Sequence, residues 1–293
     1  MPTTTITTDW HQHSHHSVEC HGNGRTLDVV IAETEARGIT DYGVTDHLHT
    51  PVNLPDIAAA SEEFHAQPRS PRAHFGIEVS VVSRWELDEI AAGRGGQPDY
   101  GLRTGGPADT DPALALRSED LVTYGIEYVV GGVHWPLYVP FEREAVIRDY
   151  HRQNLFLATH PLVTIVAHPW WWMGHWQETD GSYRGDPWID DFGKVPASMH
   201  GELAAAAREH GKVVEANHGA MLANGQYPER FRRQYAEVLA AWQAQGVTLS
   251  FATDDHGPPG QGPDAAGLGE TAELLGSAGV ALGRLWCLPA RRV

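Results

Sequence analysis

Apolar runs that predict strands alternate with stretches that predict helices over most of this chain of 293 residues. Seven runs have the length and composition of strands: 6–10, 39–44, 73–80, 127–133, 162–167, 212–216 and 247–253. Stretches typical of helices lie between most of them or follow the last: 27–37, 54–66, 142–158, 197–210, 228–245 and 265–276. This alternation predicts an α/β fold with a parallel sheet or barrel. Because no change of composition marks a boundary, we expect a single barrel domain over residues 1–293.

The first predicted strand ends in a histidine-rich stretch. His11 and His13 follow the run 6–10 and are two residues apart. Side chains with this spacing in a strand point to the same face, so the two imidazoles would converge. Converging neutral imidazoles suit a divalent transition metal. Taken alone, the stretch 11–16 is equally compatible with a cluster of solvated histidines.

Side chains of the metal-binding type recur at the ends of other predicted strands. They lie at or just beyond the C-terminal end of a strand at eight positions: His11, His13, His47, Glu78, His134, His168, Asp254 and His256. Parallel barrels form their active sites at this end, from residues of several strands. Any one of these residues is more simply explained as a core or surface side chain. The same placement in strand after strand indicates a shared metal site.

The charge and composition argue against several classes of protein. The chain has 38 acidic and 21 basic residues and a formal net charge of −17, unlike proteins that bind nucleic acid. Its two cysteines, Cys20 and Cys287, form no disulfide or zinc pattern. The N-terminus lacks the apolar segment of a signal peptide, and no run of about 18 apolar residues could span a membrane. We therefore expect a cytoplasmic protein without a nucleic-acid or membrane partner.

The polar residues at the strand ends form a series of short motifs. In chain order these are His11-Gln12-His13-Ser14 with Ser17, Thr45-Asp46-His47, Gly76-Ile77-Glu78, Gly132-Val133-His134, His168-Pro169, Glu215-Ala216-Asn217 and Thr253-Asp254-Asp255-His256. In residue type and order, the set resembles the PHP (polymerase and histidinol phosphatase) family of metal-dependent phosphoesterases. Each motif is short, but the seven together are specific, and the resemblance extends from about residue 8 to residue 280.

The resemblance implies a distorted (β/α)7 TIM-like barrel with two or three divalent metal ions (Zn, Mn or Fe) at the C-terminal ends of the strands. Carried over position by position, it implies nine ligands in three sites: His11, His13 and Asp254 for one ion, Glu78 as a bridge to a second ion held by His134 and His168, and Glu19, His47 and His256 for a third. A carboxylate that bridges two cations holds them about 3.5–4 Å apart, where they can act on one substrate oxygen and one water. Mixed nitrogen and oxygen ligands fit all three metals.

The activity implied by the resemblance is metal-dependent hydrolysis, and we expect a phosphatase that acts on a small-molecule phosphate monoester. A hydroxide that bridges two metal ions would attack in line, while the cations stabilise the developing negative charge. Glu78, Asp254 and His256 are the residues expected to serve catalysis, with Asp254 or a nearby histidine handling the proton.

The expected substrate-binding residues are less clearly marked. Histidinol phosphatases of this family carry an arginine a few residues after the Glu-x-Asn strand, but residues 218–222 contain none. Arg84, Arg143 or Arg184 could grip a phosphate instead, and His218 follows the strand directly. The missing arginine favours an alternative, a metal-dependent amidohydrolase or lactonase that cleaves a C–N or C–O bond with the same metals. A metal-binding barrel without catalytic activity is a third possibility.

Two irregular segments interrupt the alternation. Residues 92–113 are rich in Gly, Pro and Asp and predict an exposed insertion. Residues 170–195 contain five tryptophans and follow directly on a predicted ligand histidine. This segment would form a lid or aromatic wall over the metals, with Trp171 as a substrate contact and His175 as a candidate general acid, or it would pack against the barrel. The expected partner is a small-molecule substrate, and the oligomeric state is left open.

Overall fold

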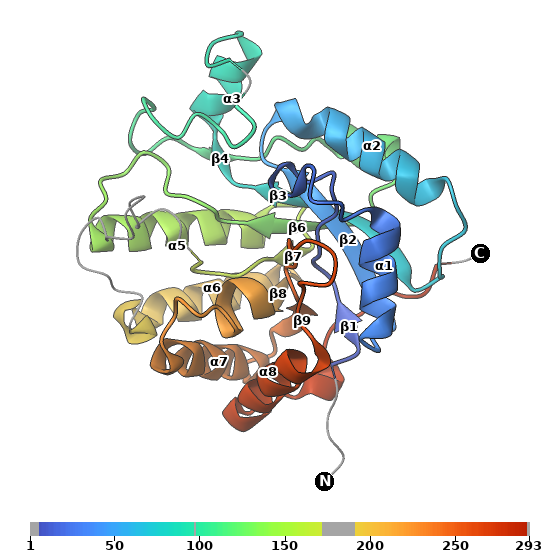
Figure 1. Ribbon diagram of the computed structural model, residues 1–293. Helices are drawn as coiled ribbons and strands as arrows, with labels where there is room; N and C mark the ends of the chain where they lie inside the picture. Colours follow the sequence, from blue (N-terminus) through green and yellow to red (C-terminus); the bar gives the residue numbers. More distant parts are fainter. Residues whose placement is uncertain (1–5, 97, 172–190, 292–293) are drawn as a thin grey trace.

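The computed structural model describes residues 6–96, 98–171 and 191–291. Within these residues, seven parallel strands form one sheet in the order β1-β2-β3-β6-β7-β8-β9 (Figure 1). Their bounds are Thr8–Asp9 for β1, Asp41–Leu48 for β2, Ala73–Ser80 for β3, Tyr128–Gly132 for β6, Ile165–Val166 for β7, Val213–Asn217 for β8 and Thr248–Ala252 for β9. The predicted parallel sheet is therefore confirmed.

The two edges of this sheet meet, so the strands form a TIM-like barrel. The amide of Asp254 donates to the carbonyl of His11 over 2.8 Å, which joins the residues that follow β9 and β1. The fully buried carboxylate of Asp9 strengthens the joint, because it accepts from N and Oγ1 of Thr253 at 2.9 and 2.5 Å. These contacts place the ends of the first and last strands side by side, and the predicted α/β barrel is confirmed.

Helices cover the outside of the barrel (Figure 1). Their bounds are Leu27–Ala36 for α1, Leu54–His65 for α2, Arg84–Ala91 for α3, Ser118–Thr123 for α4, Arg143–Thr159 for α5, Ala197–Glu209 for α6, Glu229–Ala244 for α7 and Ala265–Ala278 for α8. α1 begins where the sequence predicts, because the Thr26 hydroxyl caps the amide of Val29. It ends before Gly38, whose φ of 81° does not continue a helix. None of the described helices is long and apolar enough to cross a membrane.

The lengths of β2 and β7 differ from the prediction, because pairing with the neighbouring strands determines where each strand ends. β2 continues beyond residue 44, because Tyr42–Leu48 pair in register with Ala73–Val79 of β3. β7 is shorter than the predicted run 162–167, since only two of its residues pair with β6 and β8. The longer β2 carries His47 within the sheet, next to Glu78 on β3.

The segment between β3 and β6 is more structured than predicted. α3 and α4 were not predicted from the sequence, although Ser83 and Glu86 form a capping box at the start of α3, with side-chain to amide distances of 3.0 and 3.1 Å. The described residues of 92–113 are exposed or half-buried apart from Ala113, as expected of an insertion. The end of this segment forms β5 (Pro112–Ala113), which pairs antiparallel with β4 (Val82–Ser83).

Candidate metal centre

Glu78 lies at the centre of the strand ends. It projects from β3, is fully buried, and its two carboxylate oxygens face different histidines. Oε2 lies 2.8 Å from Nε2 of His11 and 3.5 Å from Nε2 of His13. Oε1 lies 3.2 Å from Nε2 of His134 and 3.1 Å from Nε2 of His168. One carboxylate therefore joins two groups of nitrogen donors, which we call the first group (with His11 and His13) and the second group (with His134 and His168).

Asp254 completes the first group. Its Oδ1 lies 3.5 Å from Nε2 of His11 and 3.3 Å from Nε2 of His13. The backbone of Asp254 has a φ of 54°, in the left-handed region that non-glycine residues rarely adopt. His168 of the second group also has a positive φ, of 25°. Backbone strain of this kind is concentrated at functional sites, where the surrounding structure holds it in place.

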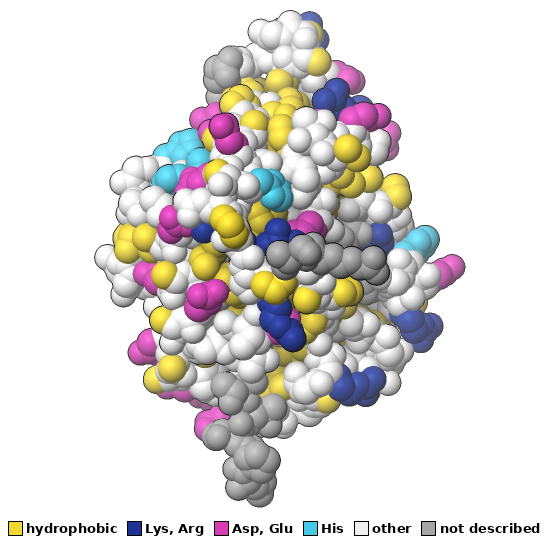
Figure 2. Space-filling model, turned by 90° about the vertical axis from the view of Figure 1, so that its right-hand side faces the viewer, with side chains coloured by type: hydrophobic (Ala, Val, Ile, Leu, Met, Phe, Trp, Pro, Cys, Tyr) yellow, Lys and Arg dark blue, Asp and Glu magenta, His cyan; other side chains and the backbone are white. Residues whose placement is uncertain are grey.

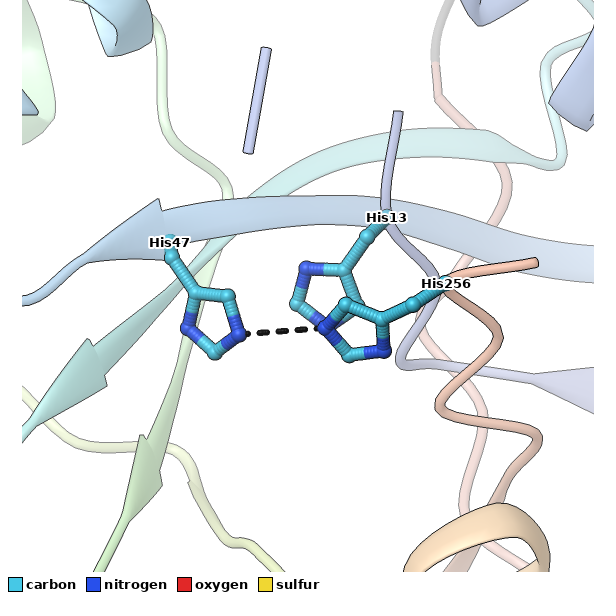
Figure 3. A group of neighbouring side chains, drawn as sticks. All are labelled: His13, His47 and His256. Carbon is cyan, nitrogen blue, oxygen red and sulfur yellow. Dashed lines mark hydrogen bonds between the residues drawn. The ribbon is translucent and has the colours of Figure 1, made fainter. Parts of the chain in front are cut away.

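The third predicted group consists of His47, His256 and Glu19. The Nε2 atoms of His47 and His256 are 3.2 Å apart, and both rings stack with that of His13 (Figure 3). Oε2 of Glu19 is 3.9 Å from Nε2 of His47. Nδ1 of His47 is also 3.0 Å from Oε2 of Glu78, which connects this third group to the other two. The structure thus brings the nine predicted ligands together in one continuous cluster.

His49 belongs to the same cluster, although it was not predicted. Its Nε2 is 2.7 Å from Oε1 of Glu19, so Glu19 lies closer to His49 than to His47. The signal was present in the sequence, because His47 and His49 have the same two-residue spacing as His11 and His13. The third group can therefore draw on four side chains, with Glu19 shared between two histidines.

A second layer of side chains determines which nitrogen faces the centre. Oε1 of Glu215 lies 2.8 Å from Nδ1 of His11. Oγ of Ser17 donates to Asp46 over 3.0 Å, so it accepts from Nδ1 of His13 at 2.9 Å. In both histidines Nδ1 carries a proton, so when the ring is neutral Nε2 is the nitrogen that can bind a metal. Glu215 and Ser17 occur in the sequence motifs, but no role was assigned to them from sequence.

Ser80 has a similar place between two further histidines. Its Oγ lies 2.6 Å from Nδ1 of His49 and 2.8 Å from Nδ1 of His134. Ser80 follows Glu78 by two residues in β3, so both side chains point to the same face of the strand. The remaining ring nitrogens, Nε2 of His49 and of His134, face the carboxylates of the cluster.

The buried charges of the cluster stabilise one another. Burial alone would raise the pKa of Glu78, but the surrounding histidines, His11 first, hold that pKa well below its usual range. Burial alone would lower the pKa of His11, but Glu78 and Glu215 raise it well above its usual value. For His13 the effect of burial dominates, and its pKa falls well below the usual value. Without metal, His11 therefore holds a proton at neutral pH while His13 is neutral.

The residues of the cluster fit divalent cations. Their inward atoms are imidazole nitrogens and carboxylate oxygens, a donor set that zinc, manganese and iron share. Nε2 of His13 and Nδ1 of His47 are buried, yet neither has a partner in hydrogen-bonding geometry among the described residues. Gly132 leaves room beside the second group, since a Cβ there would lie 2.5 Å from Oε1 of Glu78. Cations bound here would take these nitrogens as ligands and balance the buried carboxylates.

Replacing Gly132 with alanine should displace metal from the second group. The new Cβ would lie 2.5 Å from Oε1 of Glu78, and 2.6 and 2.9 Å from the Cε1 atoms of His134 and His168. Distances this short force the surrounding side chains to move. We expect elemental analysis to find about one metal ion fewer per chain and turnover to fall at least about tenfold. Gly201→Ala on α6 is the matched control, because its Cβ would meet no atom within 4 Å. Full metal content and activity in Gly132→Ala would contradict this placement of the second group.

The described start of the Trp-rich segment lies against the second group. The ring centroid of Trp171 is 5.7 Å from that of His134 and 5.3 Å from that of His168. Trp170 is fully buried, so it packs the start of the segment into the barrel. Residues 172–190, which contain His175 and the other three tryptophans of the segment, lie outside the described residues, so a lid stays a prediction.

The other predicted substrate-binding residues that the structure describes form no hydrogen bond or ion pair with the cluster. Nδ1 of His218 bonds Oγ1 of Thr271 on α8 at 2.8 Å, and burial lowers the pKa of His218 to about 4. Arg84 and Arg143 are the first residues of outer helices, and neither forms a hydrogen bond or ion pair with the cluster among the described residues. Arg143 instead pairs with its neighbour in sequence and lines a separate cavity of about 440 Å³. Arg184 lies outside the described residues.

Arg103, which was not predicted from the sequence as a site residue, lies near the third group. The guanidinium carbon of Arg103 is 4.1 Å from the ring centroid of Trp135 and 5.3 Å from that of Tyr100. Both rings adjoin His49, with centroids 5.7 and 5.3 Å away. Burial lowers the pKa of Arg103, while nearby groups that include Tyr100 and Glu19 oppose the shift. No motif marks Arg103 in the sequence, because it belongs to the irregular segment 92–113.

Comparison with known proteins shows a shared fold. No protein-family model matches the chain, and no curated protein matches it. Among solved structures, it is similar to the histidinol phosphate phosphatase of Lactococcus lactis in complex with zinc, L-histidinol and phosphate, with a TM-score of 0.56, 16% identity and 94% of both chains covered. An archaeal fructose 1,6-bisphosphate aldolase gives a TM-score of 0.37 at 10% identity, with 92% of this chain and 94% of that chain covered. The similarity to the phosphatase agrees with the barrel described above. The TM-score of the aldolase is too low to support any argument.

Proposed function

We propose that this protein is a metal-dependent hydrolase of the PHP type that cleaves a small-molecule phosphate monoester. The observation that carries the proposal is the position of Glu78, whose two oxygens face separate pairs of histidines at 2.8–3.5 Å. A carboxylate between two sets of neutral nitrogen donors is typical of a two-metal hydrolytic centre. The order of the motifs along the chain, which resembles that family, supports the same proposal.

Two or three divalent ions of zinc, manganese or iron, bound here, would activate a water and stabilise negative charge on the phosphoryl oxygens. The chain supplies orientation and proton transfer. Nδ2 of Asn217 donates to Oδ2 of Asp254 at 3.1 Å, which orients this carboxylate to take the proton of the attacking water. His256 is the most exposed histidine of the cluster, with 32% of its side chain accessible. With two ions bound in the first and second groups, it would be free to return a proton to the leaving group.

Arg103 and Trp171 are the substrate-binding residues that the geometry favours. The Arg103 guanidinium lies over two aromatic rings next to the third group, where it can bind the oxygens of a phosphate. Trp171 beside the second group offers an apolar surface to the rest of the molecule. The similar fold of a histidinol phosphate phosphatase solved with zinc and phosphate supports this class of substrate.

The alternative is a metal-dependent amidohydrolase or lactonase. It is favoured by residues 218–222, which contain no arginine, and by His218, which bonds Thr271 instead of facing the cluster. The same metals and the same general base could then act on a carboxylic ester or amide. Arg103 would bind a carboxylate of such a substrate rather than a phosphate.

A substrate panel on metal-reconstituted protein tests the proposal against this alternative. We expect turnover of phosphate monoesters to exceed that of lactones and N-acyl amino acids by more than about 100-fold. The reverse ranking would favour the alternative. A protein with its full complement of metals but no turnover of any ester, lactone or amide would contradict both hydrolytic functions.

Arg103→Met should raise KM for phosphate monoesters about tenfold or more, with a smaller effect on kcat. The substitution keeps an unbranched, largely apolar stem but removes the charge that would bind the substrate anion. Metal content should not change, because Arg103 contacts Tyr100 and Trp135 rather than the cluster itself. Arg94→Met is the matched control, since Arg94 lies in the same region and pairs with Glu89 at 2.6 Å. An unchanged KM would remove Arg103 from the substrate site.

A further inference from the structure

A second histidine cluster lies on the turn that follows the first ligands of the barrel centre. His15 and His16 face Glu63 of α2. Nε2 of His15 is 3.2 Å, and Nε2 of His16 is 2.6 Å, from Oε2 of Glu63, and the two nitrogens are 3.1 Å apart. The two rings are nearly perpendicular, at 86°, with their centroids 4.3 Å apart. Three potential ligand atoms therefore converge on one point outside the barrel centre.

We propose that His15, His16 and Glu63 form a separate binding site for a divalent transition-metal ion. Ligand atoms about 2.0–2.1 Å from a tetrahedral zinc ion are roughly 3.4 Å from one another. The separations of 3.1 and 3.2 Å are close to this value, and the third, 2.6 Å, requires only a small outward movement of His16. Two imidazoles with one carboxylate favour zinc, cobalt, nickel or copper over magnesium or calcium.

The burial and charge of the three side chains agree with such a site. His15, His16 and Glu63 have 31%, 16% and 30% of their side chains exposed, so an ion could enter from solvent and keep a water as its fourth ligand. Among the described residues, no lysine or arginine pairs with the carboxylate of Glu63. Figure 2 shows histidine and acidic side chains side by side on the face of the molecule that carries α1 and α2.

The competing explanation is a hydrogen-bonded cluster without metal. Both Nε2 atoms would then carry protons and donate to Oε2 of Glu63. Neutral imidazoles would leave the negative charge of Glu63 uncompensated, whereas a divalent cation would neutralise it. The two arrangements differ in one measurable property, the binding of added metal.

The ion would have a structural role. Oγ of Ser14 accepts from the amide of His16 at 3.2 Å and donates to Asp46 at 2.7 Å. Asp46 also accepts from Ser17, the residue that orients His13 in the barrel centre. A metal bound to His16 and to α2 would therefore fix the turn that supports His13.

The number of zinc ions bound per chain distinguishes this site from the barrel centre. The metals of the protein as isolated are counted first, and the protein is then dialysed against micromolar free zinc. We expect wild type to take up one more ion than Glu63→Gln, whose affinity for that ion should be at least about tenfold weaker. Glu62→Gln is the matched control, because Glu62 is the exposed neighbour on the same helix. His15→Gln repeats the test from the turn, so a folding defect in one variant would not decide the result.

The position of the ion is tested by anomalous scattering at the zinc edge. A peak between His15, His16 and Glu63 in zinc-soaked crystals is the expected result. Equal zinc uptake by wild type and by both variants, or a peak only at other surface histidines, would overturn the proposal. Metals missing from the barrel centre would contradict the proposed function instead, because the peripheral ion is counted separately.

Discussion

Glu78→Gln is expected to remove the metals of the first and second groups and to lower turnover more than about 100-fold. The glutamine has nearly the same size but only one acceptor oxygen. Its amide group would point at Nε2 of His11 or of His134, which are 2.8 and 3.2 Å from the present oxygens. The substitution also removes the negative charge that lies between two cations. Elemental analysis and steady-state kinetics on the purified variant measure both effects.

Glu19→Ala is the matched comparison for this experiment. Among the described residues of the cluster, Glu19 contacts only the third group, with its oxygens 2.7 Å from His49 and 3.9 Å from His47, and 27% of its side chain is exposed. We therefore expect this variant to retain the metals of the first and second groups and part of the activity. Equal losses of metal and turnover in the two variants would show that Glu78 is not a bridge between groups. The thermal unfolding of both variants shows whether either loss reflects a folding defect.

The barrel and the end that carries the cluster could be predicted from local patterns. Apolar periodicity and helix caps act over a few residues, so features such as the Thr26 cap and the strand 73–80 are visible in the sequence alone. Parallel strands place their C-terminal ends together, so Glu78 on β3 and Asp254 after β9 were expected to meet. That the predicted ligands would cluster could therefore be predicted without knowing any individual contact between them.

The remaining features depend on contacts between distant segments. Glu215 orients His11 although the two are 204 residues apart, and no local pattern shows that distance. The path of residues 92–113 follows no periodicity, so the position of Arg103 beside Trp135 could not be predicted. Arg84 and Arg143 were chosen by residue type alone, and each is the first residue of a helix, without a hydrogen bond or ion pair to the cluster among the described residues.

Removal of all metals is expected to abolish activity, and zinc or manganese should restore it. The loss should exceed about 100-fold, because no side chain of the cluster can replace two cations next to the substrate. Chelator treatment followed by dialysis, with activity and metal content measured at each step, tests this expectation. Activity that survives complete removal would contradict a metal-dependent mechanism.

Metal removal should also change how stability depends on pH. In the metal-free protein, Glu78 and Glu215 outweigh burial and raise the pKa of His11 well above its usual value of about 6.5. This raised pKa stabilises the metal-free fold below about pH 6.5, and the stabilisation is lost as pH rises through the folded-state pKa. Metal requires neutral His11, so binding should displace its proton and become tighter as pH rises.

The two forms of the protein should therefore respond to pH in opposite ways. Metal-free protein is expected to unfold at a lower temperature as pH increases from about 6 to 9, whereas the metal-bound form should not lose this contribution, because its His11 is already neutral. Calorimetric titration in buffers of different ionisation enthalpy would count the protons released, about one for the ion that binds His11. Metal binding without proton release would mean that His11 is neutral in the metal-free cluster. That result would contradict its position between Glu78 and Glu215, each 2.8 Å away.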